Sequence, residues 1–251
     1  MAERVAFITG AASGIGFATA RQLLAEGWRV AIADRDAAAL DTARSALGGA
    51  AGILALPLDI TDEAAAAAAI ARCVEALGGL DGVVNSAGIA ADVPALDTPV
   101  DLFRRVLDVN VVGTFIVAQA AARVMAARGG GAIVNIASVS GLRGNKGRSA
   151  YGASKGAVVT LTQVLANDLA RFHIRVNAVA PGPVDTPMVK AMHVDTDRAL
   201  WSRHLPMRRY GTPEEIAGPI AFLLDGAKSS YITGEILAID GGFTGAGIIA
   251  D

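Results

Sequence analysis

Three side chains that could exchange a proton with a substrate oxygen stand in the middle of the sequence: Ser138, Tyr151 and Lys155. The run of small and β-branched residues 132–137 precedes Ser138 and is typical of a buried parallel strand. An alanine-rich helix is expected to begin near Ser149, and on it Tyr151 and Lys155 share one face because they lie four residues apart. We therefore expect a hydroxyl, a phenol and an ammonium group around one crevice, at the carboxyl end of a strand.

The expected neighbourhood of Tyr151 suits acid–base chemistry. A free tyrosine has a pKa of about 10, which is too high for a good base at neutral pH. An ammonium about 4 Å away is worth roughly 4 kcal/mol at an effective dielectric constant near 20. That energy would lower the pKa of the phenol by up to about three units. The sequence thus predicts that Lys155 lowers the pKa of Tyr151, while Ser138 hydrogen-bonds the same substrate oxygen.

A glycine-rich segment, residues 10–16, follows the short apolar run 5–9 and precedes a helical pattern over 17–26. Strand, turn and helix in this order form the context of a phosphate-binding loop. Glycines allow the backbone to approach a pyrophosphate, and a helix N-terminus favours negative charge. The next apolar run ends at Asp34, eighteen residues after Gly16, near the spacing of an acid that binds the adenine ribose. A dinucleotide site is predicted, the alternative being a glycine-rich turn without a ligand.

These motifs resemble the short-chain dehydrogenase/reductase family. The Ser and Tyr-x-x-x-Lys arrangement is similar to the active site of that family, and Thr9 with residues 10–16 is similar to its Thr-Gly-x-x-x-Gly-x-Gly turn. Residues 85–88 resemble its Asn-Asn-Ala-Gly motif, with Ser86 in place of the second Asn. The resemblance extends in order and spacing over residues 4–242.

The resemblance implies four catalytic residues: Asn110, Ser138, Tyr151 and Lys155. Tyr151 would be the general acid and base, Ser138 would orient the substrate oxygen, and Lys155 would tune the phenol and bind the ribose. The backbone carbonyl of Asn110 would hold a water that bridges to the lysine. Alternatively, Asn110 is an asparagine at a helix bend or an interface.

Motifs and resemblance together imply a cofactor site formed by Gly10, Ser13, Gly14, Ile15, Gly16, Asp34, Arg35, Asp59, Ile60, Asn85, Ala87, Gly88, Tyr151, Lys155, Pro181, Gly182, Val184 and Thr186. Asp34 favours NAD, because a 2′-phosphate would meet a carboxylate there. Arg35 can accommodate that phosphate, so NADP is the second choice. Asp59, expected to end the third strand, would contact the adenine. Alternatively, it is a charge ahead of a helix capped by Thr61.

The irregular pattern around residues 187–210 predicts a substrate lid. Candidate substrate-binding residues are Ser140, Arg143, Arg148, Met188 and Met192. Together with Lys146, the two arginines would meet an anionic substrate group or simply form a solvated basic loop. The three histidines are scattered and show no metal-ligand spacing, so no metal is expected.

Strand and helix patterns alternate along all 251 residues. This alternation predicts one domain, residues 1–251, with a Rossmann-type α/β fold: a doubly wound parallel sheet of about seven strands with helices on both faces. The formal net charge of −2 provides no basic surface for nucleic acid. No uninterrupted apolar run reaches the roughly 20 residues that span a membrane, and the lone cysteine, Cys73, falls in an apolar helical pattern. A cytoplasmic protein is expected.

The expected helices 100–128 and 150–172 carry more apolar residues than one buried face needs, and the tail 243–250 is apolar as well. Since relatives commonly pair these helices, the resemblance implies a homotetramer. The function expected is an NAD-dependent oxidoreductase that moves a hydride between a secondary alcohol or ketone, its small-molecule partner, and nicotinamide. The alternatives are an NADPH-dependent carbonyl reductase of the ketoacyl type and a non-catalytic dinucleotide-binding redox regulator.

Overall fold

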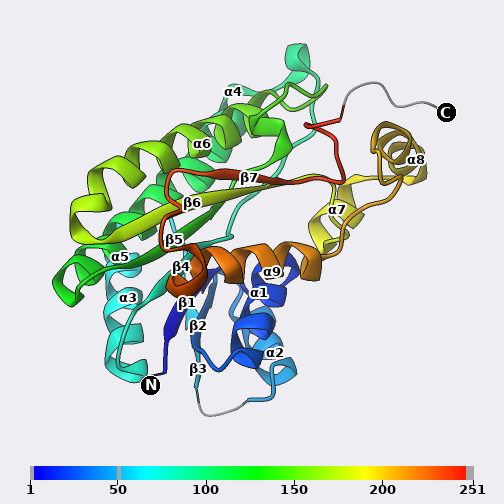
Figure 1. Cartoon of the computed structure of the whole chain (residues 1–251). Coiled ribbons are helices and arrows are strands. Elements are labelled where there is room, and N and C mark those ends of the chain that lie inside the picture. The colour runs from blue at the N-terminus through cyan, green and yellow to red at the C-terminus, as the bar shows by residue number, and fades with distance from the viewer. Residues whose placement is uncertain (1–2, 50–51, 247–251) are drawn as a thin grey trace.

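A seven-stranded parallel sheet forms the centre of the computed structural model, which describes residues 3–49 and 52–246 (Figure 1). The strand order is β3-β2-β1-β4-β5-β6-β7, and every neighbouring pair is parallel. The order reverses between β1 and β4, and open α/β sheets bind ligands at such a point. The strands are β1 Val5–Thr9, β2 Arg29–Asp34, β3 Ile53–Pro57, β4 Gly82–Asn85, β5 Gly131–Ile136, β6 Ile174–Pro181 and β7 Ile236–Ile239.

Helices cover both faces of this sheet (Figure 1). On one face lie α1 Gly14–Ala25, α2 Ala37–Ala46 and α9 Pro213–Leu224. On the other lie α3 Glu63–Leu77, α5 Thr114–Arg128 and α6 Ser149–Leu169, with α4 Val100–Leu107 packed against α6. The short helix α10, Gly226–Ser229, follows α9. The fold class predicted from the alternating pattern is confirmed.

Alternate side chains of β1 supply the two halves of the core. Phe7 packs in the cluster that contains Ile70 of α3, whereas Ile8 packs in the opposite cluster with Leu23 of α1 and Ile216 of α9. All five are at most 1% exposed. Burial of one such side chain contributes about 1.5–3 kcal/mol. Packing on both faces of the sheet therefore fixes the strand, and this in turn fixes the position of the glycine-rich turn that follows it.

The long helix expected over residues 100–128 is interrupted. A π-helical turn, Asp108–Gly113, separates α4 from α5 and contains Asn110. Such turns insert one extra residue and are frequent at functional sites. By length and composition alone the stretch Val100–Arg128 could cross a membrane, but half of its apolar window is buried in the protein, so it is a core helix.

The start of α3 differs from the expectation. Strand β3 ends at Pro57, so Asp59 follows the strand instead of ending it. The N-cap of α3 is Asp62, whose carboxylate accepts from the backbone N–H of Ala65 at 2.9 Å. Thr61 was the wrong residue for the cap, because its hydroxyl donates to the carboxylate of Asp59 at 2.7 Å.

Two short helices occupy the segment expected to form an irregular lid: α7 Pro187–Met192 and α8 Asp195–His204. In Figure 1 they lie at one end of the sheet, beyond the chain that leaves β6. We call residues 187–204 the α7–α8 segment. Of the apolar tail 243–250, residues 247–250 lie outside the described residues.

Candidate active site

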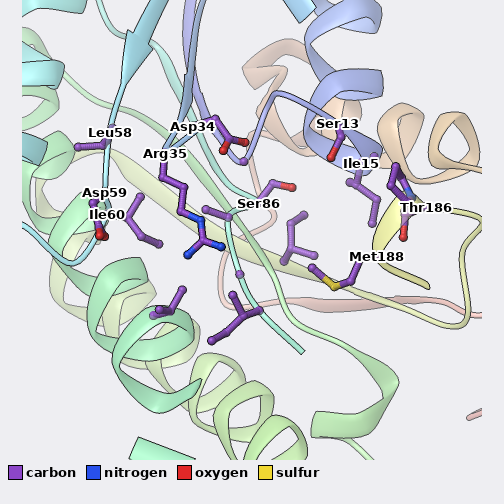
Figure 2. A pocket seen from close by; sticks show the side chains of 18 of the residues that line it. Ser13, Ile15, Asp34, Arg35, Leu58, Asp59, Ile60, Ser86, Thr186 and Met188 are labelled. Atoms are coloured by element: carbon purple, nitrogen blue, oxygen red, sulfur yellow. The ribbon is translucent and has the colours of Figure 1, made fainter. Parts of the chain in front are cut away.

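A cavity of ≈ 260 Å³ lies at the carboxyl ends of β1, β2 and β4, where the strand order reverses. Figure 2 shows Asp34, Arg35, Asp59 and Ile60 toward one end of it and Thr186 and Met188 toward the other. The cavity contains these residues expected from the sequence: Gly10, Ser13, Gly14, Ile15, Asp34, Arg35, Asp59, Ile60, Ala87, Gly88, Tyr151, Lys155, Thr186 and Met188.

Sequence patterns missed four of the residues that line the cavity: Leu58, Ile89, Val109 and Ile136. Ser86 lies in the motif 85–88 and Pro187 in the predicted lid, but neither was named as a site residue. Leu58 and Ile136 could have been found, because each stands at or just beyond the carboxyl end of a strand. Of the expected residues, these are not part of the lining in the described structure: Gly16, Asn85, Asn110, Ser138, Ser140, Arg143, Arg148, Pro181, Gly182, Val184 and Met192.

The turn after β1 fits a dinucleotide. Gly10 has φ +64°, and a Cβ atom there would lie 2.7 Å from the backbone of Ala87. Gly14 begins α1 with φ +56° and faces Thr186. In the described structure the N-cap residue Ser13 makes no side-chain cap hydrogen bond and the first turn of α1 holds no acid. The N–H groups of this helix end are thus open to an anion.

The opposite end of the cavity carries charge of both signs. Asp34 ends β2, and its carboxylate accepts from the backbone N–H groups of Ala12 and Asp36, each at 3.3 Å. Figure 2 shows the side chain of Arg35 extending into the cavity. Two hydrogen bonds from Thr61 hold the pKa of Asp59 below its usual value, and the charge of Arg35 adds to this effect.

Lys155 reaches the cavity from α6 with a largely buried side chain, 6% exposed. Its Nζ donates to the backbone carbonyl of Ile136 at 2.6 Å. Burial disfavours the ammonium form and lowers the pKa of Lys155 to about 8.

The expected effect of Lys155 on Tyr151 is wrong for this structure. The pKa of Tyr151 is raised, since burial outweighs a hydrogen bond with the side chain of Ser138 and the charge of Arg148. Lys155 is directed at Ile136, and its Nζ lies 5.8 Å from the centre of the Tyr151 ring. The prediction from sequence left out two contributions of opposite sign: desolvation, which raises the pKa of Tyr151, and the charge of Arg148, which lowers it.

Asn110 connects the elements around the catalytic candidates. Its Oδ1 accepts from the N–H of Ile89 at 2.8 Å, and its Nδ2 donates to the Ser154 hydroxyl at 3.0 Å. That hydroxyl donates to the backbone carbonyl of Tyr151 at 2.7 Å. The carbonyl of Asn110 itself accepts from Thr114 at 2.8 Å. The π-helical turn thereby ties the loop after β4 to α6.

Other residues expected at the cofactor site do not line the cavity of the described structure but make contacts within the protein. Asn85 is buried and donates to Asn135 on the neighbouring strand at 2.9 Å. Val184 forms an isolated bridge with Gly211. At Gly182 a Cβ atom would meet Asp240, and at Gly16 it would meet the carbonyl oxygen of Gly10, so both positions permit close backbone packing.

The candidate substrate loop is largely engaged with the protein itself. Arg143 donates to the carbonyl of Thr244 at 2.8 Å, and Ser140 accepts from Asn145 at 3.1 Å. Arg148 lies 3.3 Å from the carboxylate of Asp92 and 3.0 Å from His193. No sequence motif connected these residues.

The fold and the cavity define a Rossmann-type α/β protein whose site fits a dinucleotide, and comparisons with known proteins agree. A family model described as enoyl-(acyl carrier protein) reductase matches residues 10–244. The chain is 43% identical over 244 residues to the cis-4-hydroxycyclohexanecarboxylate dehydrogenase of Sinomonas cyclohexanicum, covering 97% of each. It is 46% identical over 242 residues to the galactitol 2-dehydrogenase (L-tagatose-forming) of Cereibacter sphaeroides, covering 95% of this chain and 94% of the relative.

A solved structure gives the same result. The short-chain type dehydrogenase/reductase from Mycobacterium marinum matches with a TM-score of 0.92 and 39% identity, covering 97% of this chain and 96% of that one. The protein belongs to the short-chain dehydrogenase/reductase family. It is accordingly an oxidoreductase that acts on CH–OH groups or the corresponding ketones with a nicotinamide dinucleotide. Among residues 3–49 and 52–246, no group of three His, Cys, Asp or Glu side chains is arranged to hold a metal ion.

The buried ammonium predicts a pH-dependent stability. The native state releases the Lys155 proton at about 8, whereas an unperturbed lysine, the reference for the unfolded chain, has a pKa of 10.5. Between these values the unfolded state binds more protons, so stability rises with pH, by up to about 3 kcal/mol. Urea denaturation from pH 7 to 10 should show this rise in the wild type and its loss in Lys155→Met. The exposed Lys190→Met is the control that should keep it. Parallel curves for wild type and Lys155→Met would contradict the assignment.

Proposed function

We propose that the protein is an NAD-dependent oxidoreductase that transfers a hydride between a secondary alcohol or ketone and nicotinamide. One observation carries this proposal: Tyr151 and Lys155 line the same cavity as the glycine-rich turn and Asp34. A proton-exchanging pair therefore lies beside a site that fits a dinucleotide. The redox-regulator alternative is disfavoured, since all four expected catalytic residue types are present and the two relatives described above are named dehydrogenases.

Each catalytic candidate has a distinct role in this proposal. Tyr151 exchanges the proton of the substrate oxygen, and Ser138, which interacts with the same phenol, orients that oxygen. Lys155 is the buried cation at the cavity that binds the ribose. Asn110 fixes the loop after β4 against α6. A bound nicotinamide dinucleotide supplies the hydride acceptor or donor.

The proposed substrate class is a secondary alcohol or its ketone. The names of two relatives, a cis-4-hydroxycyclohexanecarboxylate dehydrogenase and a galactitol 2-dehydrogenase, support this class. Met188 at the cavity and the α7–α8 segment beside it support a substrate lid over residues 187–210. We also propose that residues 1–251 act as one catalytic domain in the cytoplasm, which suits a chain whose single cysteine is buried.

Replacing Tyr151 by Phe tests the acid–base role. The variant keeps the ring and its packing but cannot exchange a proton. Turnover should fall by roughly 10²–10⁴-fold, while the dissociation constant for NAD⁺ stays near the wild-type value. A panel of cyclic and acyclic secondary alcohols and ketones, followed by the absorbance of reduced nicotinamide, measures turnover. Calorimetric titration with NAD⁺ is the control. Near-normal turnover in the variant would refute the mechanism.

The choice of cofactor rests on Asp34 and Arg35. The carboxylate of Asp34 at the end of β2 suits a ribose with free hydroxyls, whereas the guanidinium of Arg35 in the cavity would favour a 2′-phosphate. NAD⁺ should bind at least about tenfold more tightly than NADP⁺, which calorimetry measures directly. Asp34→Asn should reduce this ratio, because it removes the negative charge, and Arg35→Ala should further weaken NADP⁺. A tenfold preference for NADP⁺ would favour the carbonyl reductase alternative.

We propose a homotetramer on the evidence of apolar side chains left exposed on the helices that relatives pair. Val112, Phe115 and Val164 are 45%, 38% and 49% exposed. Light scattering at micromolar concentration should give four times the mass of 25.4 kDa. Phe115→Glu should shift the mass downward, because each interface would bury an unpaired carboxylate. The exposed Leu200→Glu on α8 serves as the control. A monomeric wild type would overturn the proposal.

A further inference from the structure

Arg148 forms the centre of a cluster of charged and aromatic side chains beside Tyr151. It directly precedes α6, and only 10% of its side chain is exposed. Its Nη2 lies 3.3 Å from Oδ2 of Asp92 and 3.0 Å from Nε2 of His193. The guanidinium carbon lies 5.6 Å from the centre of the Tyr151 ring. Three loops therefore meet at one cation, next to the proposed acid–base residue.

The hydrogen bond between Arg148 and His193 fixes the state of the imidazole. A guanidinium only donates, so Nε2 of His193 must accept and carries no proton. The other nitrogen, Nδ1, then holds the proton and donates to the hydroxyl of Tyr210 at 2.8 Å. His193 and Tyr210 are 9% and 7% exposed. Both ring nitrogens are thus engaged, and the imidazole is neutral.

His193 stands at the joint of the α7–α8 segment. It is the C-cap residue of α7, and its ring stacks with Trp201 of α8 at 6.3 Å between centroids. An ion pair of 2.7 Å between Arg198 of α8 and Asp185, which precedes α7, also holds the segment. The link to Arg148 is therefore a direct contact between the α7–α8 segment and the beginning of the helix that carries Tyr151.

We propose that His193 and Arg148 are positioning residues that couple docking of the α7–α8 segment to the charge around Tyr151. When the segment is docked, His193 holds the guanidinium of Arg148 against the phenol. When the segment leaves, Arg148 loses that acceptor, and its guanidinium is drawn toward its remaining partner, the carboxylate of Asp92. The inference rests on the acid–base role proposed for Tyr151, and it adds a reason why the segment must close before proton exchange: a nearby cation favours the phenolate.

The pKa shifts of Tyr151 and His193 agree with this geometry. Burial raises the pKa of Tyr151, and a hydrogen bond with Ser138 and the charge of Arg148 oppose it. Lys155 also faces the ring, at 5.8 Å. Burial lowers the pKa of His193 below its usual value, and the charge of Arg148 contributes. The other charged groups that act on His193 are Asp197, Asp92 and Arg198.

Direct binding of an anionic substrate by Arg148 is the competing role. In the described structure Arg148 is not among the residues that line the cavity, and its contacts are made to Asp92, His193 and the Tyr151 ring. The loop backbone also fixes it, since Val93 and Arg148 form an isolated parallel bridge. The cation is thus held by the protein before any substrate arrives.

Titration of the tyrosines tests the proposal without a substrate. The chain has three tyrosines, so ¹³Cζ labelling gives three signals that Tyr151→Phe, Tyr210→Phe and Tyr231→Phe assign. Arg148→Gln should raise the pKa of Tyr151 by about one unit, because a cation near the phenol is lost. Arg148→Lys keeps the charge and should stay closer to the wild type. His193→Ala should also raise it, and His193→Gln should restore it by offering Arg148 an acceptor.

The outcomes are decisive in both directions. A Tyr151 pKa that does not move in Arg148→Gln or in His193→Ala overturns the proposal, as does an equal shift in His193→Gln and His193→Ala. In turnover assays Arg148→Gln should lower kcat for neutral and anionic substrates alike. A loss confined to KM for anionic substrates would instead assign Arg148 to substrate binding. Since the titration needs no turnover, a wild type inert toward the whole panel would refute the proposed function without deciding the coupling.

Discussion

The site depends on one buried cation, the ammonium of Lys155. A charge removed from water is costly unless it is held by good partners, and the pKa decrease from 10.5 to about 8 corresponds to about 3 kcal/mol. Its short bond to the carbonyl of Ile136 requires α6 to lie tightly against the end of β5. Gly141 permits this approach, since a Cβ atom there would lie 2.5–2.7 Å from the backbone of Lys155 and Gly156.

The remaining structure around the cavity serves the same close packing. The π-helical turn directs Asn110 at both the loop after β4 and Ser154, and Ser154 in turn bonds the carbonyl of Tyr151. Gly88 lies where a Cβ atom would stand 3.0 Å from Oδ1 of Asn110. Small residues and the paired amide of Asn110 thus let the loop after β4, the π-helical turn and α6 pack closely together.

Local patterns were sufficient for much of the fold. The apolar run before the glycine-rich turn, the acid at the end of β2 and the Tyr-x-x-x-Lys spacing each depend on a few neighbouring residues, and the structure contains the strands and the helix that they predict. The cap of α3 was misplaced by one residue, because Thr61 and Asp62 are both good caps and only the packed helix selects between them. The π-helical turn was missed because six residues do not distinguish its period from that of an α-helix.

Contacts between residues far apart in the sequence could not be predicted from local patterns of this kind. Lys155 bonds a backbone carbonyl, which has no residue identity to recognise, and Arg148 meets His193 across forty-five positions of sequence. The sign of the shift in the pKa of Tyr151 followed from these contacts: burial dominates, and the ammonium that was expected to oppose it is directed at Ile136. The ionisation of the phenol is therefore set mainly by its burial, which the hydrogen bond with Ser138 and the charge of Arg148 oppose. The residue types determine which ionisable groups are present at the site, whereas the packing around these groups determines their pKa values.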